Sequence, residues 1–523
     1  MGNEEFDVAV VGGGPNGLTC AAYLARAGAR TVVLDKRFEW GGTMVTDDYS
    51  TPFLYNLCQF TLPVGLGLPP YSDLELNRFA VRFLEPDPAV AFVPEGGGDP
   101  LVVGRDGAAL GLAGSLDAVD HVMLPLLYTP PVPVEEVERV LDHDEGKQVL
   151  DMARLTPAAM TEAAADARAA GLMRYLCLLA GFTRPDEPLG LVGAFALTRL
   201  LRPTIVAGGT KSLANGLLRA GAKAGAQYRN VADVVRIDAN EGALRLACRD
   251  ERQFTARAVV STLDPRSTFL ELLDPAVVPS EIRSAAEDWR VDRVGPFVAH
   301  FGIKGQPPRL ASEDATRALL QVVGFVDGAS VADHIETAAA DRVPERPAGH
   351  LTVTTAHDPL QASTGPFGPL HTLRYETPAP NDHPQGIWDR QRAGYRTQCW
   401  ELLGSRVTGL NDARLLFAFA DSPRDIERRF RTTRAGSVRQ GTLAREQTFA
   451  ARPHRDCSSG RTPIDGLYLG GGGVHPGVPG SLGGGYNAAR AVCSDLGLER
   501  WWPDPPSVEH AREVGLLPEV RIA

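Results

Sequence analysis

The sequence has little of what marks several large classes of protein. Its seven cysteines are odd in number and include no C-x-x-C pair, which argues against a disulfide scaffold or a zinc site and fits reduced thiols. We predict no metal site. No apolar run approaches the ~20 residues of a membrane span. Basic residues form no run and the formal net charge is −11, so we predict no nucleic-acid partner, because neutralising phosphates needs clustered cations.

What remains is the composition of an ordinary globular enzyme. Hydrophobic residues make up 44% and charged residues 22% of the 523 residues, and this length predicts more than one packed domain. The acidic stretch 1–6 lacks the positive charge of a signal peptide, and Phe6 stands where a myristoylation motif needs Ser or Thr. We therefore expect a cytoplasmic protein that contacts a membrane, if at all, through loops.

The first informative stretch is a strand, a glycine loop and a helix near the N-terminus. The apolar run 6–11 predicts a buried parallel strand, and it enters a G-x-G-x-x-G loop formed by Gly12, Gly14 and Gly17. In such a loop the first glycine permits the turn, the second lets the backbone approach a pyrophosphate, and the third lets helix and strand pack closely. A second strand ends at Asp35, 18 residues beyond Gly17, near the spacing that brings a carboxylate to a ribose. This order predicts a dinucleotide site.

Neighbouring residues complete the predicted site. Pro15 and Asn16 begin the helix, whose free N–H groups and positive dipole end favour phosphates. Lys36 and Arg37 follow the acidic residue directly, and we expect Arg37 to pair with a phosphate. All four are therefore assigned to cofactor binding.

The segment from Asp35 to Thr43 selects the kind of dinucleotide. It resembles the E-x-x-x-x-x-G-G-R segment of glutathione-reductase-like FAD proteins, such as amine oxidases and carotenoid desaturases. The resemblance implies FAD as the cofactor, with Gly41 and Gly42 bringing a second backbone loop to the pyrophosphate and the flavin. Two positions depart from the family pattern: Asp35 replaces the usual Glu, and Thr43 replaces the frequent Arg.

Two later segments extend the resemblance. Residues 206–213 are similar to the desaturase segment that precedes a strand lying against the adenine, and residues 467–477 are similar to the L-Y-L-x-G-x-G-x-H-P-G segment of phytoene-dehydrogenase-like proteins. Residues 358–359, 422–427 and 449–453 look like landmarks of the branch that includes the pyridine-nucleotide-disulphide-oxidoreductase-domain proteins. The resemblance adds these cofactor-binding residues: Val234, Gly472, Gly473 and Pro479.

The resemblance implies an α/β fold with a discontinuous domain. A glutathione-reductase-like Rossmann FAD-binding domain is expected from residues 1–75, 200–290 and 445–500. A mixed α+β substrate domain with a helical lid is expected from residues 76–199 and 291–444. Residues 501–523 are expected to form a C-terminal tail.

The same resemblance implies the chemistry. We expect an FAD-dependent oxidoreductase of the desaturase or dehydrogenase type, which removes two hydrogens from an apolar or semi-polar small molecule and passes hydride to flavin N5. An amine oxidase of the same fold, a flavin-dependent isomerase and a non-catalytic, prenyl-binding escort-like protein are the alternatives. The electron acceptor stays open among oxygen, a quinone and a nicotinamide, and the oligomeric state is open.

Candidate catalytic residues come from two places. His475 follows the C-terminal glycines, and it either acts at the flavin or braces the turn through its backbone contacts. Asp47, Asp48, Tyr49 and Tyr55 follow the loop of Gly41 and Gly42, where the chain crosses toward the substrate domain. Any one of these could accept a proton, and we single out Asp48 and Tyr55 beside His475 as the catalytic candidates.

Overall fold

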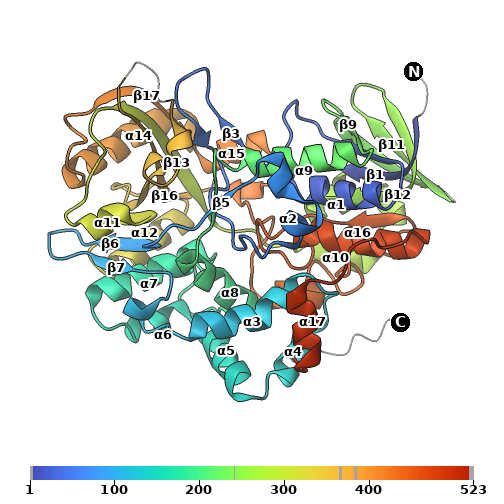
Figure 1. Cartoon of the computed structure of the whole chain (residues 1–523), viewed down its shortest axis with the longest axis horizontal. Helices are drawn as coiled ribbons and strands as arrows, with labels where there is room; N and C mark the ends of the chain where they lie inside the picture. Colours follow the sequence, from blue (N-terminus) through green and yellow to red (C-terminus); the bar gives the residue numbers. More distant parts are fainter. Residues whose placement is uncertain (1–3, 241, 364–367, 382–385, 518–523) are drawn as a thin grey trace.

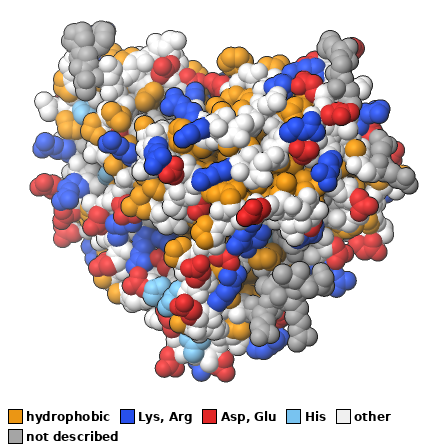
Figure 2. Space-filling model, turned by 45° about the vertical axis from the view of Figure 1, so that its right-hand side comes forward, with side chains coloured by type: hydrophobic (Ala, Val, Ile, Leu, Met, Phe, Trp, Pro, Cys, Tyr) orange, Lys and Arg blue, Asp and Glu red, His pale blue; other side chains and the backbone are white. Residues whose placement is uncertain are grey.

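The computed structural model describes residues 4–240, 242–363, 368–381 and 386–517. Two seven-stranded sheets organise it, and helices pack around both (Figure 1). On the face drawn in Figure 2, basic and acidic side chains are interspersed, with apolar side chains between them. No described helix is long and apolar enough to cross a membrane.

The first sheet is mainly parallel and has the strand order β10-β11-β12-β1-β2-β9, with β18 added beside β12. Strands β10 and β11 form an antiparallel extension on β12. Every strand of this sheet lies within the segments 1–75, 200–290 and 445–500. The strands are β1 (Glu4–Val11), β2 (Thr31–Leu34), β9 (Gln227–Arg229), β10 (Val234–Asn240), β11 (Ala243–Cys248), β12 (Gln253–Ser261) and β18 (Leu467–Leu469).

Both faces of this sheet are buried, as β1 shows. Successive side chains of a strand point to opposite faces, and those of β1 are apolar on both. Val8 and Val10 pack in the core formed with α1 (Pro15–Arg26), α9 (Lys211–Lys223) and α16 (Gly483–Leu496). The next residues in the alternation, such as Ala9, pack with η3 (Ser267–Glu271) and α10 (Ser280–Glu287) on the other side. Figure 1 shows α1, α9 and α16 gathered on one side of the sheet.

Helices α1 and α16 meet at their N-termini. The side-chain oxygen of Asn16 accepts a hydrogen bond from the Gly485 N–H at 3.2 Å, so a residue near the start of the chain caps a helix near its end. A Cβ at Gly485 would overlap the backbone carbonyl of Asn16. This approach between the two helices therefore requires glycine.

The second sheet has the order β17-β13-β16-β15-β14-β6-β7 and is antiparallel except for the pair β14 and β6. Its strands all lie within 76–199 and 291–444. They are β6 (Val90–Val93), β7 (Leu101–Val103), β13 (Val294–Lys304), β14 (Leu320–Val323), β15 (Gly349–Val353), β16 (Leu370–Pro380) and β17 (Arg414–Asp421).

The two faces of this sheet differ in chemistry. One face packs Phe297 and Phe301 against the long helix α14 (Ile387–Arg406). On the opposite face, the register places His300 beside Arg374 and places Glu376 beside His350. Facing residues in antiparallel strands lie on the same side of a sheet, so this register gathers charged and imidazole side chains on one face.

A layer of short helices, most of them from residues 115–201, is drawn in the lower part of Figure 1, with α12 beside it. Its members share one apolar core with the helices of the first sheet. They are α3 (Ser115–Leu127), α4 (Val134–Val140), α5 (Asp144–Arg154), α6 (Pro157–Glu162), α7 (Ala167–Leu179), α8 (Gly190–Leu201) and α12 (Gly328–Ala339). The remaining short elements are α2 (Pro69–Asp73), α11 (Glu313–Arg317), α13 (Thr354–His357), α15 (Pro423–Arg429), β3 (Thr46–Asp47), β4 (Tyr55–Asn56), β5 (Phe83–Leu84) and β8 (Ile205–Val206).

The segment 501–517, expected to be part of a tail, is packed against the body of the protein. Trp502 is buried, and the Trp501 indole N–H donates to the Tyr23 carbonyl at 3.1 Å. Helix α17 (Pro506–Glu513) lies against α3. Burial of the large Trp502 indole explains why this segment packs against the protein, because the indole's apolar surface would remain in water in a solvated tail.

A glycine-to-alanine pair tests the contact between α1 and α16. We expect Gly485→Ala to lower the free energy of unfolding by about 1–3 kcal/mol, the usual cost of overpacking. Gly394→Ala is the matched control: this glycine also lies within a helix, α14, but a Cβ there would meet no atom within 4 Å. The control should raise the free energy of unfolding by about 0.5–1 kcal/mol through helix propensity. Urea unfolding measures both, and equal effects would contradict the close packing described here.

Candidate active site

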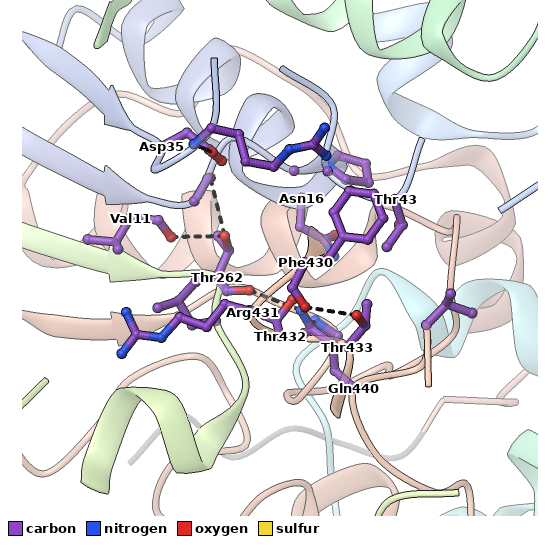
Figure 3. Close-up of a pocket in the computed structure, with 18 of the residues that line it drawn as sticks. Val11, Asn16, Asp35, Thr43, Thr262, Phe430, Arg431, Thr432, Thr433 and Gln440 are labelled. Atoms are coloured by element: carbon purple, nitrogen blue, oxygen red, sulfur yellow. Dashed lines mark hydrogen bonds between the residues drawn. The ribbon is translucent and has the colours of Figure 1, made fainter. Parts of the chain in front are cut away.

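A deep cleft opens at the carboxyl ends of β1, β2 and β12, which is where parallel sheets bind nucleotides. With its open mouth the cleft holds about 1020 Å³. Figure 3 shows side chains from far-apart segments, such as Asp35, Thr262 and Gln440, converging on it. Most of the predicted cofactor-binding residues line it: Gly12, Gly14, Pro15, Asn16, Asp35, Lys36, Arg37, Gly42, Thr43, Val234, Gly472 and Pro479.

Two facing glycines make the cleft fit a dinucleotide. A Cβ at Gly14 would meet only the Gly42 Cα, 4.0 Å away, so it would project into free space. Helix α1 begins at this point, and its N-cap residue Gly14 offers no side-chain cap. A Cβ at Gly42 would lie 2.9 Å from the Gly14 Cα, so the two backbones touch here, and the groove beside them at an uncapped helix N-terminus suits a pyrophosphate. Gly14, Gly42 and the start of α1 would therefore hold that part of FAD.

Asp35 lines the same cleft and already shapes its rim. Its carboxylate accepts hydrogen bonds from the Gly13 N–H at 2.6 Å and the Arg37 N–H at 2.7 Å. Burial raises the pKa of Asp35, although these backbone N–H groups and the charge of Arg37 oppose the rise. The carboxylate lies at the end of β2, which is the position predicted for a ribose contact.

Arg37 has partners other than the phosphate predicted for it. Its guanidinium forms a 2.7 Å ion pair with Glu39 and lies over the ring of Phe430, with 4.7 Å to the ring centroid. These contacts hold Arg37 against one wall of the cleft. In the structure the charge of Arg37 is therefore balanced by Glu39.

That wall comes from a segment in which the sequence showed no motif. Residues 430–433 and 438–440 line the cleft, although they fall inside the stretch 291–444 assigned to the substrate domain. The Thr433 hydroxyl donates to the Phe430 carbonyl at 2.8 Å, which holds the turn in place (Figure 3). Only the tertiary fold brings this segment to the nucleotide cleft.

The C-terminal glycine loop is held by two side chains to which the sequence assigned no role. The Gln440 side-chain oxygen accepts from the Gly472 and Gly473 N–H groups at 2.6 and 3.2 Å. The buried guanidinium of Arg452 donates to the Gly472 carbonyl at 2.7 Å and also to the carbonyls of Thr442 and Gln447. Arg452 belongs to the segment 449–453, whose family likeness was the only signal for it.

Three predicted cofactor residues support the cleft from behind. A Cβ at Gly17 would overlap the Gly12 carbonyl, so Gly17 allows the helix and strand to pack as its place in the motif suggests. The Gly41 N–H donates to the Gly13 carbonyl at 2.9 Å. Gly473 contacts Gln440 as described, and none of the three lines the cleft.

A second cavity of about 950 Å³, its open part included, adjoins the first. Gln59, the pair Val438 and Arg439, and the pair Val478 and Pro479 border both. The other lining residues are mostly apolar: Phe60, Leu62, Pro63, Leu179, Ala196, Leu200, Leu320 and Leu443. A molecule in this cavity would lie against the part of the cleft bordered by the C-terminal segment.

The charged side chains of the second cavity are ion-paired. Arg374 and Glu376 pair at 2.7 Å, and Arg199 pairs with Asp120 at 3.0 Å. Arg439 pairs with Asp292 at 2.9 Å. The described wall is therefore close to electrically neutral despite three arginines.

Asp48 and Tyr55, two of the predicted catalytic residues, line neither cavity. Asp48 is exposed on a loop, where its carboxylate accepts from the Ser50 N–H at 2.8 Å. Tyr55 is buried among aromatic rings, with the rings of His300 and Phe419 at 5.6 and 5.1 Å, and burial raises its pKa. In these positions neither side chain faces the space described for a substrate.

His475 is buried behind the glycine loop and lines neither cavity. Its Nε2 lies 2.8 Å from the Leu126 carbonyl at the end of α3, and its ring lies 5.7 Å from that of Phe449. Burial lowers its pKa to about 4, so the ring is neutral at pH 7. This arrangement favours the bracing role over action at the flavin.

Comparison with known proteins places this geometry in a family context. A family model described as an NAD(P)-binding Rossmann-like domain matches residues 10–66, and one described as flavin containing amine oxidoreductase matches residues 135–353. One of the subunits of the limonene dehydrogenase of Castellaniella defragrans is 28% identical, over 98% of this chain and 99% of that protein. Pyridine nucleotide-disulfide oxidoreductase domain-containing protein 2 of Rattus norvegicus is 24% identical over 94% of each chain.

Solved structures share the fold. Putrescine oxidase bound to putrescine has a TM-score of 0.60 at 15% identity, over 95% of this chain and all of that one. Cyclohexylamine oxidase from Brevibacterium oxydans has a TM-score of 0.53 at 14% identity, over 94% and 99%. The predicted fold class, the FAD cofactor and the family resemblance are confirmed. The chain is an FAD-dependent oxidoreductase with dehydrogenase or oxidase activity on a small molecule, and it resembles the amine-oxidase-like flavoproteins.

Substitution of Gly14 tests the pyrophosphate groove. Gly14→Ala should fold normally, because its Cβ meets free space, but it should lose most bound FAD because the methyl group occupies the groove. Gly67→Ala, outside the cleft and with room for a Cβ, is the control and should keep FAD. Flavin released on denaturation and the melting temperature of the flavin-free protein measure the two effects. Full FAD content in Gly14→Ala would show that the groove is elsewhere.

The bracing role of His475 predicts a loss of stability without a loss of rate. His475→Ala removes a buried hydrogen bond and should lower the free energy of unfolding by about 1–3 kcal/mol, while FAD-loaded protein is reduced by substrate at close to the wild-type rate. His475→Gln, which keeps an N–H donor, should recover part of the stability. Anaerobic rapid mixing on fully FAD-loaded samples separates rate from occupancy. A slowed reduction of His475→Ala by about 10²–10⁴-fold would restore the catalytic assignment.

Proposed function

We propose that this enzyme dehydrogenates a neutral, apolar small molecule, such as a cyclic hydrocarbon, in the second cavity. FAD, when bound in the first cleft, supplies a two-electron acceptor for hydride from a substrate C–H bond. The observation that carries the proposal is the apolar second cavity that adjoins the dinucleotide cleft. The name of the relative from Castellaniella defragrans, a limonene dehydrogenase, supports a substrate of this class.

The charges of the cavity disfavour the amine alternative. An ammonium substrate needs an uncompensated carboxylate or an aromatic cage, whereas Glu376, the carboxylate of the described lining, is paired with Arg374. Phe60 is the one Phe, Tyr or Trp among those lining residues. A neutral substrate also avoids the cost of moving a charge from water into a mainly apolar cavity.

The walls of the cavity position the substrate and exclude water. Leu179, Ala196 and Leu200 contribute from the helical layer, and Leu320 contributes from the second sheet. Apolar contact of this kind holds a hydrocarbon through burial of its surface, and it leaves orientation to shape. The protein is expected to bind and orient the substrate in this way when the cofactor carries out the chemical step.

The proposal extends to the surroundings of the enzyme. An apolar substrate partitions into lipid, so the loop contact with a membrane expected from the sequence belongs to the same proposal. We also propose that the enzyme acts in the cytoplasm. Its seven cysteines are all unpaired and buried, which agrees with a reducing compartment.

Anaerobic bleaching of the flavin band tests the substrate class. We expect limonene to bleach the wild-type enzyme, and putrescine and cyclohexylamine to leave it oxidised. Bleaching by the amines alone would support C–N oxidation instead, and conversion of limonene to a rearranged product without net bleaching would support an isomerase. Oxygen, a quinone and NAD⁺ are then added in turn to the reduced enzyme, and the rate of recolouring identifies the electron acceptor.

A cavity-filling variant tests where the substrate binds. Ala196→Phe narrows the second cavity and should raise the substrate concentration needed for half-maximal bleaching by about tenfold, equivalent to about 1.4 kcal/mol, with unchanged FAD content. Ala393→Phe, on the exposed side of α14, is the control. Equal behaviour of the two variants would place the substrate outside this cavity.

A further inference from the structure

We propose that Glu376 accepts the proton that the substrate loses during dehydrogenation. The inference rests on the proposed function. In the step, the substrate gives up one hydrogen with its bonding electron pair to the flavin and a neighbouring hydrogen as a proton to the Glu376 carboxylate. The electron pair of the second C–H bond becomes the second bond of the new C=C, so atoms and electrons balance.

The position of Glu376 carries the proposal. It lies on β16, opposite His350 on β15, and among the described residues lining the second cavity it is the one carboxylate. Its side chain is 19% exposed, whereas that of its partner Arg374 is 5% exposed. Both residues line the cavity, and the acid is the more exposed member of the pair.

Arg374 holds the carboxylate in place and in its ionised form. Its guanidinium pairs with Glu376 at 2.7 Å and donates to the carbonyls of Asn56 and Cys58 at 3.3 and 3.2 Å. Burial by itself would raise the pKa of Glu376, but the charge and the hydrogen bond of Arg374, helped by the charge of Arg439, outweigh burial and lower it. A fixed, ionised carboxylate is what proton abstraction at a defined carbon requires.

The other titratable groups of the cavity are less suited to the role. Burial raises the pKa of the Cys58 thiol to about 12, so it remains protonated. Burial lowers the pKa of His350 to about 4, and its Nδ1 lies 2.9 Å from the Tyr175 hydroxyl, which occupies one ring nitrogen. At neutral pH Glu376 is thus the charged base of this wall.

A third cavity offers the proton a way out. Glu376 also lines this cavity of about 540 Å³, its open part included, together with Tyr175, Asp292 and Ser437. The Asp292 carboxylate accepts from the Ser437 hydroxyl and from Arg439. Because Glu376 borders both cavities, it can take a proton on the substrate side and release it on the other. Protonation of Glu376 leaves the charge of Arg374 without its partner, and this cost favours release of the proton.

Variants of two ion-paired carboxylates test the proposal. Glu376→Gln should keep FAD and bind limonene with unchanged affinity in the flavin-free protein, measured by calorimetry, but should be reduced about 10²–10⁴-fold more slowly. Asp504→Asn is the matched control. It also removes a carboxylate that is ion-paired with an arginine, Arg490, at 3.0 Å, but neither residue lines a cavity described above, so reduction should stay close to the wild-type rate.

Glu376→Asp is the second variant, for the case that Glu376→Gln unfolds because it loses the ion pair. It preserves the charge opposite Arg374 but withdraws the carboxylate by one methylene, so reduction should slow by about 10–10²-fold. Infrared difference spectra add a readout that does not depend on rate. Reduction by limonene should create a protonated carboxyl band in the wild type that is missing from Glu376→Gln, whereas reduction by dithionite should not create it.

The outcomes separate the two proposals. A folded, FAD-loaded Glu376→Gln or Glu376→Asp that is reduced as fast as the wild type overturns the role of Glu376 and leaves the proposed function intact. A carboxyl band that forms in Glu376→Gln as it does in the wild type overturns it as well. A wild type that no hydrocarbon reduces contradicts the proposed function, and the proton acceptor with it.

Discussion

One buried guanidinium, that of Arg452, joins the loops on which both cavities depend. It is fully buried, and its N–H groups donate to the carbonyls of Gly472, Thr442, Gln447 and Arg439. Those carbonyls belong to the C-terminal glycine loop and to the segment that separates the nucleotide cleft from the second cavity. An arginine suits this task because its rigid fork presents five donors and keeps its charge when buried.

The second sheet supplies chemistry because of its register. Strand pairing alone sets Glu376 opposite His350 and Arg374 opposite His300, and α14 takes the apolar side of the same strands. A shift of one residue would turn the polar set into the α14 core. The charges are acceptable on the cavity side because each is paired there, which lowers the cost of burying them. Fold likeness to amine oxidases therefore coexists with a wall that suits a neutral molecule.

The nucleotide half of the protein was predictable because its determinants are local or conformational. A strand, three glycines, a helix and an acid at fixed spacing specify a phosphate groove wherever they occur, and the groove beside Gly14 and Gly42 lies where that order expects it. The strands of the two sheets fall within the sequence segments expected for two domains. The packed segment around Trp502 departs from the expected tail, since contact with Tyr23 depends on residues almost the whole chain away.

The sequence by itself determined a dinucleotide-binding strand, loop and helix, because glycine conformation and strand periodicity act over short stretches of chain, and its family resemblance indicated the fold class and FAD. Only the tertiary structure decided which side chains line the two cavities. His475, Asp48 and Tyr55 were chosen by their distance along the chain from the glycine loops, yet packing directs them to Leu126, to the surface and into an aromatic cluster. Glu376, Gln440 and Arg452 carry no motif of their own, and they reach the cavities because long-range strand register and loop packing bring them there.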